Sequence, residues 1–587
     1  MIRYKFIIGF IIVITFILLI RIFQIAVGHS EYYDRLAMQN IIKKDWVIPI
    51  RGEIVDRNGQ PLAVNRIGFS LNLAPHLRAN VLKESAEFMA KKFDLDKENI
   101  KRRYRQQNSF YNHDLIEVAP FIEYDLMMPY ISMLEREPFI TVQPATLREY
   151  PLADAAAHVL GYVGRYAGEG DDTARRIGVI GKTGLEKSYN EHLQGELGYE
   201  RVKVNASNER VELLEYVAPK ENKRLELTID AKLQKYLKEL YEDKSGAAIV
   251  MDTDGKILGA LSYPAYDPNL FVTGISQSDW DAIRFDFDNP FTNKFSNGLY
   301  PPGSVIKMQV GLSFFDAGDV TENSSVVCES NFELGGHVFR CWDRDGHGRV
   351  DFLRAIRESC DDYFYKNSLN TGINKIAEVL REVGLGERTG VDLDNEAYGT
   401  VPDIPWKHRR HNQRWYQGET IISSIGQGYM LTTPLQIART TAAMATNKLP
   451  TPHFVATKQM QKSAYEPEVI QANPQTMDLI RESMREVVTH PKGTARWNTR
   501  QARVDMAAKT GTAQVVSIPQ DQKERMDPEE VEFYDRSHAW FTAYAPYDDP
   551  KYVVTILVEH GASGSAVGGP MSAKIFNWLA DNGYIKD

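Results

Sequence analysis

A serine and a lysine three positions apart are the residues of this chain best suited to nucleophilic chemistry. Ser304 and Lys307 follow the turn-forming sequence Tyr300-Pro301-Pro302-Gly303. A serine hydroxyl becomes a useful nucleophile when a base lies against it. Residues three apart share one face of a helix, so we expect the Lys307 amine to reach the Ser304 oxygen. The pair predicts a nucleophilic serine with its own proton acceptor.

Two further motifs strengthen this prediction, because a serine and a lysine at this spacing also occur by chance. Ser359-Cys360-Asp361 follows the first pair, and Lys509-Thr510-Gly511-Thr512 lies nearer the C-terminus. This is the motif order of penicillin-binding proteins and serine β-lactamases, and the chain resembles that superfamily. The resemblance implies acyl transfer through a serine ester.

Other segments resemble the monofunctional (class B) penicillin-binding proteins, and some resemble the penicillin-binding protein 2 enzymes of cell elongation. The match covers nearly the whole chain, so we expect a peptidoglycan D,D-transpeptidase that β-lactams inhibit. The class B segments are Arg51-Gly52-Glu53-Ile54, Asp56-Arg57-Asn58-Gly59, Gly181 to Glu186, Leu227 to Asp230 and Tyr300 to Ser304. The narrower segments are Gly346-His347-Gly348, Trp415-Tyr416-Gln417-Gly418 and Ile425-Gly426-Gln427-Gly428.

The resemblance assigns catalytic roles to the first two motifs. Ser304 would attack the penultimate carbonyl of a D-alanyl-D-alanine stem peptide, with Lys307 as the general base. Ser359 would relay protons between Lys307 and the leaving amine. Asp361 stands where the superfamily usually has asparagine, and an ionised carboxylate accepts hydrogen bonds but does not donate them. We therefore expect Asp361 to contact the substrate differently, unless it is protonated or faces a donor.

The third motif is expected on an edge strand, to which the donor peptide adds as a further strand. Lys509, Thr510 and Thr512 would bind the terminal carboxylate of the substrate. The backbone N–H groups of Ser304 and Thr512 would stabilise the oxyanion. Gly511 would allow the substrate to approach closely, because a side chain there would block it.

The three cysteines, Cys328, Cys341 and Cys360, lie near one another in the sequence with His347 among them. Three sulfurs and one nitrogen fit a closed tetrahedral zinc site. The resemblance supports zinc as a structural cofactor, because penicillin-binding protein 2 enzymes hold zinc near the catalytic cleft. Two alternatives remain, a Cys328–Cys341 disulfide with Cys360 free or three unrelated core cysteines.

The N-terminal residues form an apolar segment. Arg3 and Lys5 precede Phe6 to Gly28, in which Arg21 is the one charged residue. About 20 helical residues span a bilayer core, and Arg21 can extend towards the headgroups. A cleaved signal peptide is the alternative, but the end of the segment has no A-x-A cleavage site. We predict a single-pass anchor of the inner membrane, with the N-terminus in the cytoplasm and the catalytic domain in the periplasm.

The length of 587 residues predicts more than one domain. We predict the anchor at 1–28, a pedestal domain at 45–224 and a transpeptidase domain at 225–587. Residues 45 to 59 are expected to form one alternating strand, and residues 82 to 137 amphipathic helices. A second K-T-G sequence, Lys182-Thr183-Gly184, is interpreted as a structural turn before a helix.

The fold class expected for the C-terminal part is α+β, with a five-stranded antiparallel sheet flanked by helices. Asp254-Gly255 predicts a hairpin between strands at Ala247 to Asp252 and Lys256 to Ser262. The other predicted strands are Met506 to Ser517, His538 to Tyr544 and Tyr552 to Glu559. The predicted helices are 304–317 and 431–445.

The net charge of −9 is mild for this length, and no nucleic-acid partner is expected. Basic clusters such as Lys101-Arg102-Arg103 and Lys407-His408-Arg409-Arg410 are interpreted as solvated surfaces. The partners that the resemblance implies are stem peptides, a SEDS-type glycan polymerase and rod-shape scaffold proteins. The alternatives to a transpeptidase are a β-lactamase or D,D-carboxypeptidase, and a catalytically silent β-lactam sensor or scaffold.

Overall fold

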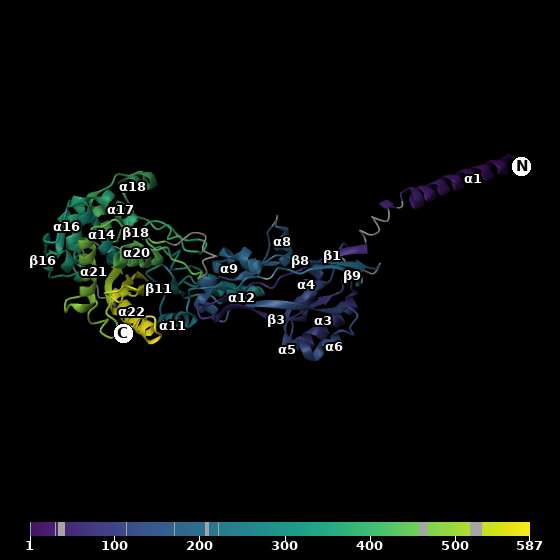
Figure 1. Cartoon of the computed structure of the whole chain (residues 1–587), viewed down its shortest axis with the longest axis horizontal. Coiled ribbons are helices and arrows are strands. Elements are labelled where there is room, and N and C mark those ends of the chain that lie inside the picture. Colours follow the sequence, from purple (N-terminus) through teal and green to yellow (C-terminus); the bar gives the residue numbers. More distant parts are fainter. Residues whose placement is uncertain are drawn as a thin grey trace. The chain divides into compact units, whose positions relative to one another are not determined.

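Two compact units make up the chain (Figure 1). The computed structural model describes residues 2–29, 31–32, 41–112, 114–168, 171–205, 210–220, 222–456, 466–516 and 531–586. One unit contains Met1–Gly52, Tyr166–Val179 and Glu191–Lys223, and the other contains Glu53–Arg165, Ile180–Asn190 and Arg224–Asp587. This division differs from the predicted boundary after residue 224, because strand β10 (Leu225–Glu226) pairs with β2 (Ile54–Val55).

The first unit begins with helix α1 (Ile2–Phe23), which continues as a π-helical turn at Gln24–Gly28. The stretch Tyr4–Gly28 contains an 18-residue window with a mean hydropathy of 3.0, and none of that window is buried. It is long and apolar enough to span a bilayer, as predicted. The unit also contains α8 (Asp172–Ile177) and an antiparallel sheet in the order β1-β8-β9. Its strands are Ile42–Val47, Gly198–Val204 and Arg210–Val217.

The single strand predicted for residues 45 to 59 is wrong. The chain forms β1 up to Val47 and a separate short strand, β2, at Ile54–Val55, and the two strands belong to different sheets. Pro49 interrupts the extended run, and a proline has no N–H to donate to a strand ladder. The Asn58-Gly59 turn that was expected after β2 is present, with Gly59 at a φ of +81°.

The second unit has a sheet in its N-terminal part, in the order β10-β2-β3-β4 with β5 also paired to β3. Strand β3 is Pro61–Leu73, β4 is Ile116–Glu123 and β5 is Ile140–Glu149. Helices α3 (Ala79–Phe93) and α4 (Lys97–Gln107) contribute to the same hydrophobic core as β3 and β4. The prediction of helices throughout 82 to 137 therefore missed β4, a short alternating segment that the surrounding helical pattern obscured.

Short elements connect this part to the C-terminal part of the unit. Lys182-Thr183 lies directly before α9, which begins at Gly184, and this second K-T-G occupies a turn before a helix as expected. The connecting elements are α5 (Tyr124–Met127), α6 (Ile131–Leu134), α7 (Ala157–Leu160), β6 (Val163–Arg165), β7 (Val179–Gly181) and α9 (Gly184–Ser188). Helix α10 (Asn190–Gln194) lies in the first unit from Glu191 onward.

A five-stranded antiparallel sheet in the order β12-β11-β21-β20-β19 forms the centre of the C-terminal part. This confirms the predicted sheet and fold class, and β19 is an edge strand. The predicted strand Met506 to Ser517 is shorter, and Ser517 lies outside the described residues. The strands are β11 (Gly246–Asp252), β12 (Ile257–Tyr263), β19 (Ala507–Ala513), β20 (His538–Ala545) and β21 (Tyr552–Val558).

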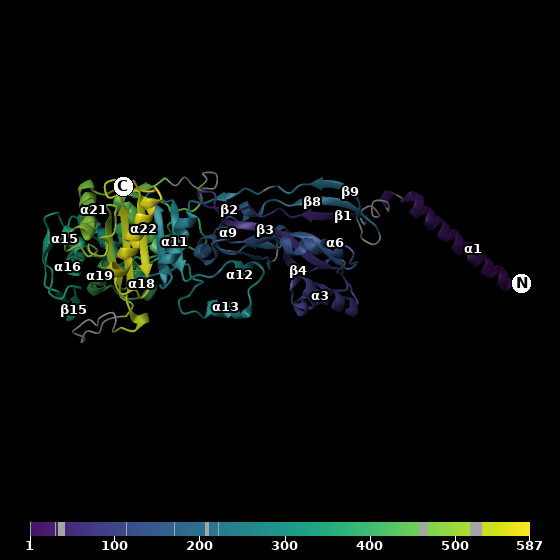
Figure 2. The same ribbon diagram turned by 90° about the horizontal axis from the view of Figure 1, so that it is seen from below.

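Helices cover both faces of this sheet. Figure 2 shows α11 (Ala231–Tyr241) and α22 (Gly569–Asp581) on one face. Helix α20 (Pro434–Thr446) packs on the other, where Thr441 bonds Thr542 of β20. Further helices are α12 (Asn269–Val272), α13 (Gln277–Arg284), α14 (Lys307–Asp316), α15 (Phe352–Arg357), α16 (Asp361–Thr371), α17 (Ile373–Glu382), α18 (Ile404–His411), α19 (Gln417–Ser424) and α21 (Pro474–Thr489).

Candidate active site

The turn that carries Ser304 is a short 3-10 segment, Gly303–Ile306, and α14 begins only at Lys307. The helix predicted from residue 304 therefore starts three residues later. Residues three apart eclipse one another in a 3-10 helix, so the spacing still places both side chains on one side. Gly303 has a φ of +57°, and its N–H donates to the Gly426 carbonyl at 2.9 Å.

Three contacts from distant parts of the chain fix the residues before Ser304. The Trp540 indole N–H donates to the Pro301 carbonyl at 3.0 Å. The Tyr300 hydroxyl donates to Glu559 Oε1 at 2.7 Å, and the Tyr300 N–H donates to the Thr432 carbonyl at 3.0 Å. Burial and the Glu559 charge raise the pKa of Tyr300. Ser304 therefore lies on a turn that is fixed by contacts with several distant segments of the chain.

Lys307 is fully buried and bonds the middle motif. Its Nζ donates to the Ser359 carbonyl at 2.9 Å, to Ser359 Oγ at 3.4 Å and to Asp361 Oδ1 at 2.7 Å. The hydrogen bonds found among the described residues do not join this amine to Ser304, which differs from the expected contact. The ion pair with Asp361 holds the amine beside Ser359, so the role of Lys307 as a base stays a prediction.

Ser359 lies between the two lysines. Its hydroxyl is 3.4 Å from Lys307 Nζ and 2.9 Å from Lys509 Nζ. Its φ of +54° is rare for a residue with a side chain, and such backbone strain often occurs at functional sites. Burial, and then the nearby Lys307 charge, hold the pKa of Lys509 well below its usual range, while Asp361 opposes this. The structure thus brings the three motifs together, as the sequence predicted.

Asp361 faces two donors. Its Oδ1 accepts from Lys307 Nζ, and its Oδ2 accepts from the Trp342 N–H at 3.0 Å. An ionised carboxylate suits both partners, since each of them is a donor. This explains how the chain accommodates aspartate at this position of the motif.

The third motif occupies the edge strand β19, as expected. The reason proposed for Gly511 is wrong, however. A Cβ added there would lie 2.9 Å from Val305 Cγ1, 3.1 Å from Trp540 Cβ and 3.2 Å from the Pro302 carbonyl oxygen. The missing side chain therefore makes room for the turn that carries Ser304. Thr510 bonds Thr494 at 2.9 Å, and the Thr512 carbonyl accepts from Gln427 Nε2 at 3.4 Å.

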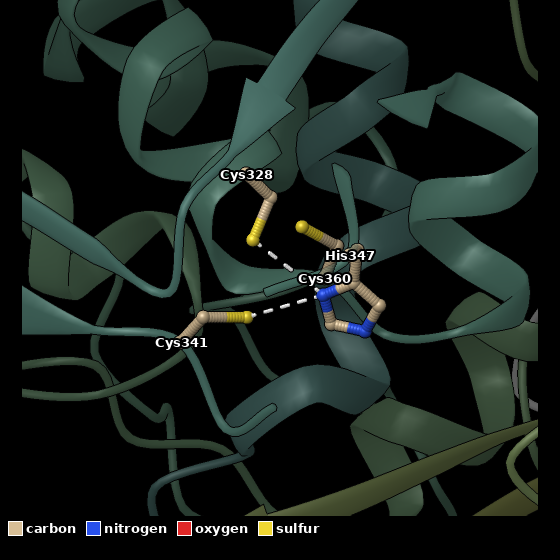
Figure 3. Close-up of side chains that lie close together, drawn as sticks. All are labelled: Cys328, Cys341, His347 and Cys360. Atoms are coloured by element: carbon tan, nitrogen blue, oxygen red, sulfur yellow. Dashed lines mark hydrogen bonds between the residues drawn. The ribbon is translucent and has the colours of Figure 1, made fainter. Parts of the chain in front are cut away.

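The three cysteines and His347 form one buried cluster (Figure 3). Their ligand atoms all lie within 4.8 Å of one another, and His347 Nδ1 is 3.6 Å from Cys328 Sγ and 3.5 Å from Cys341 Sγ. The cysteines are free, so the structure contains neither the alternative disulfide nor three unrelated cysteines. Cys341 Sγ also accepts from the Asp361 N–H at 3.4 Å, which connects the cluster to the middle motif.

The pKa values show how the cluster distributes charge. Hydrogen bonding from Cys360 is the largest cause that lowers the pKa of Cys341, to about 2, and that of Cys328, to about 6. The pKa of Cys360 is raised, first by its bonds to Cys328 and Cys341. Burial opposes the charged form of His347, but the two sulfurs raise its pKa to about 9. Three cysteine sulfurs and an imidazole nitrogen are the donor set of a site for a soft divalent cation.

Sequence reasoning missed four residues that hold the site, namely Trp342, Gly426, Trp540 and Glu559. They support the catalytic turn or the middle motif through the contacts described above. Gly426 stands in one of the segments that carried the family resemblance, which was a usable signal. The others lie far in sequence from the residues that they hold, and local patterns give no sign of such contacts.

Comparison with known proteins identifies two family domains along the chain. The penicillin-binding protein transpeptidase domain matches residues 246–581, and the penicillin-binding protein dimerisation domain matches residues 47–227. The peptidoglycan D,D-transpeptidase MrdA of Haemophilus influenzae is 32% identical to this chain, over 97% of this chain and 90% of that protein. The MrdA of Escherichia coli K12 is also 32% identical, over 95% of this chain and 91% of that protein.

Solved structures agree with this similarity. In the complex between the penicillin-binding protein PBP2 and MreC from Helicobacter pylori, the matching chain is 44% identical, with a TM-score of 0.83 over 93% of this chain and 100% of that one. A structure described as the structural coordination of polymerization and crosslinking by a peptidoglycan synthase complex matches at 25% identity and a TM-score of 0.73. That match covers 100% of this chain and 99% of the other.

Proposed function

This chain belongs to the penicillin-binding proteins with a transpeptidase domain, and we propose that it cross-links peptidoglycan stem peptides during cell elongation. The enzyme is a serine-type D,D-transpeptidase. The observation that carries the mechanism is the convergence of Lys307 and Lys509 on the Ser359 hydroxyl, next to an edge strand. Three motifs from separate parts of the sequence thereby form one hydrogen-bonded cluster.

In the first half-reaction, the Ser304 oxygen attacks the penultimate carbonyl carbon of the donor stem. Unprotonated Lys307 takes the hydroxyl proton, and Ser359 passes a proton to the departing D-alanine amine as the peptide bond breaks. The N–H groups of Ser304 and Thr512 stabilise the oxyanion, at about 3 kcal/mol per donor. The turn before Ser304 abuts β19, since a Cβ on Gly303 would lie 2.9 Å from the Thr512 carbonyl oxygen.

In the second half-reaction, an amine of a second stem attacks the ester carbonyl. The amine loses a proton to the Lys307–Ser359 pair, the new amide bond forms, and Ser304 leaves with its proton restored. Lys509, Thr510 and Thr512 are proposed to bind the donor carboxylate. The place of Lys509 on the edge strand supports this, with its Nζ 2.9 Å from the Ser359 hydroxyl.

The test of this function is a map of the adduct formed with a fluorescent penicillin. We expect a stable ester on Ser304 in the wild type and none in Ser304→Ala. Rapid release of the label would indicate a β-lactamase. An unlabelled wild-type protein would indicate a silent scaffold and would refute the proposal.

We further propose that Cys328, Cys341, His347 and Cys360 hold a structural zinc ion. The fit of the donor set supports this, because four buried ligand atoms of sulfur and nitrogen type lie within 4.8 Å of one another. The ion would stabilise the segment that carries Ser359 and Asp361 from behind. Asp343 Oδ2 lies 3.8 Å from His347 Nε2, which is too far for a hydrogen bond that would orient the imidazole.

The proposed location is the inner membrane, with α1 as a single-pass anchor, the N-terminus in the cytoplasm and the catalytic part in the periplasm. Arg3 and Lys5 on the short N-terminal side support this orientation. The partners proposed are a glycan polymerase and a scaffold protein such as MreC. Similarity to the Helicobacter pylori complex and to the synthase complex supports them.

A further inference from the structure

A basic surface near the catalytic turn is not used in the mechanism above. The segment 404–418, which includes α18, contains Lys407, Arg409, Arg410 and Arg414 and has no acidic residue, although the chain has a net charge of −9. Lys407 is buried and pairs with Glu419, whereas the three arginines are exposed to solvent. We call Arg409, Arg410 and Arg414 the basic patch.

Aromatic rings pack around the segment that carries the basic patch. Lys407 Nζ lies 4.9 Å from the centre of the Tyr416 ring and 5.7 Å from that of Tyr429. The His411 ring at the end of α18 is 5.2 Å from the Tyr429 ring, and the Arg414 guanidinium lies 4.7 Å from the Tyr416 ring. A patch that is held in this way loses little conformational freedom when it binds a ligand.

Helix α19 connects the basic patch to the turn that carries Ser304. The helix follows Tyr416 directly, and beyond its end Gly426 accepts from Gly303 and Gln427 donates to the Thr512 carbonyl. Helix α18 lies beside α19 in Figure 2, and Lys407 bonds Glu419 of α19. At 1.5 Å per helical residue, the path from Tyr416 to Gly426 is about 15 Å.

An extended peptide of five residues spans about 17 Å, so an acceptor stem whose side-chain amine lies at Ser304 can direct its C-terminal carboxylate along α19 towards the basic patch. The edge of β19 is assigned to the donor stem. The second stem must therefore approach Ser304 from a direction other than the edge of β19. Its C-terminal carboxylate is complementary to arginine, whose planar guanidinium binds carboxylates with two hydrogen bonds. We propose that the basic patch binds the carboxylate of the acceptor stem peptide, an inference that rests on the proposed transpeptidase function.

The experiment separates the two half-reactions. A small thioester donor acylates Ser304, and the acceptor is a five-residue stem peptide with a free side-chain amine that ends in a carboxylate or in an amide. We expect Arg409→Gln/Arg410→Gln to slow transfer to the carboxylate form about three- to tenfold and to leave transfer to the amide form unchanged. Arg409→Lys/Arg410→Lys keeps the charges but loses the planar fork, and is expected to retain only part of the preference.

The matched control is Arg102→Gln/Arg105→Gln on the exposed face of α4, which removes the same charge elsewhere. Rising salt should weaken the carboxylate preference of the wild type. The proposal is overturned if the arginine substitutions slow transfer to the two acceptors equally, or if the control variant slows transfer to the carboxylate acceptor as much. It is also overturned if the substitutions impair only binding to phosphatidylglycerol vesicles. Penicillin labelling of Ser304 is measured in parallel, and its absence in the wild type would overturn the transpeptidase function itself.

Discussion

Replacement of Gly511 by alanine tests how the edge strand supports the nucleophile. The new Cβ would lie 2.9 Å from Val305 Cγ1, whereas carbon atoms in contact are normally about 3.5–4.0 Å apart. The turn that carries Ser304 must therefore retreat from β19 by roughly 0.6–1.1 Å. Overpacking of this kind costs about 1–3 kcal/mol, and a displacement near 1 Å can slow a positioned reaction about a hundredfold. We expect slower acylation as well as a lower Tm.

The assay is the rate of acylation by a fluorescent penicillin, measured with the Tm of the same preparation. Gly164→Ala is the matched control, because the atoms that its Cβ would meet belong to the flexible Lys182 side chain. We expect Gly164→Ala to acylate at the wild-type rate. Acylation of Gly511→Ala at the wild-type rate would refute the reasoning, because it would show that the packing of β19 against the turn does not position Ser304.

Three other predictions concern single groups. Because the pKa of Lys509 is lowered, this lysine loses its proton below the usual pH of about 10.4. The rate of acylation by penicillin should therefore decline as pH rises through this pKa, whereas acylation by the penicillin methyl ester, which has no carboxylate, should not. An equal decline for both compounds would contradict the role of Lys509 in binding the carboxylate. Tyr300→Phe removes the hydroxyl that donates to Glu559 and should lower the free energy of unfolding by about 1–3 kcal/mol in denaturant titrations. The control is Tyr363→Phe, which should cost much less because the buried Tyr363 hydroxyl meets no partner among the described residues. Similar losses in the two variants would argue against the Tyr300 contact. Purified protein should contain about one equivalent of zinc by elemental analysis, and a chelator should lower its Tm; zinc below about a tenth of an equivalent would exclude the site.

The amino-acid sequence determined the chemistry of this protein because the reacting groups stand in short motifs with a characteristic order. The pairing of Ser304 with Lys307 was predicted from residue types and spacing, whereas the roles expected for Lys509 and the edge-strand motif came from the family resemblance. Residue types also predicted the hairpin around Asp254-Gly255, where the turn residues determine the local backbone. The cysteine cluster was also predictable, because all three cysteines of the chain lie near one another in the sequence with His347 among them.

Tertiary structure alone decided which groups contact one another. Lys307 lies against Ser359 and Asp361, and Gly511 makes room for Val305, although nothing near either residue in the sequence indicates this. The division of residues 45 to 59 between two sheets likewise depends on strands more than a hundred residues away. Local patterns report the conformational preferences of neighbouring residues, whereas these contacts arise from the packing of distant segments into one core.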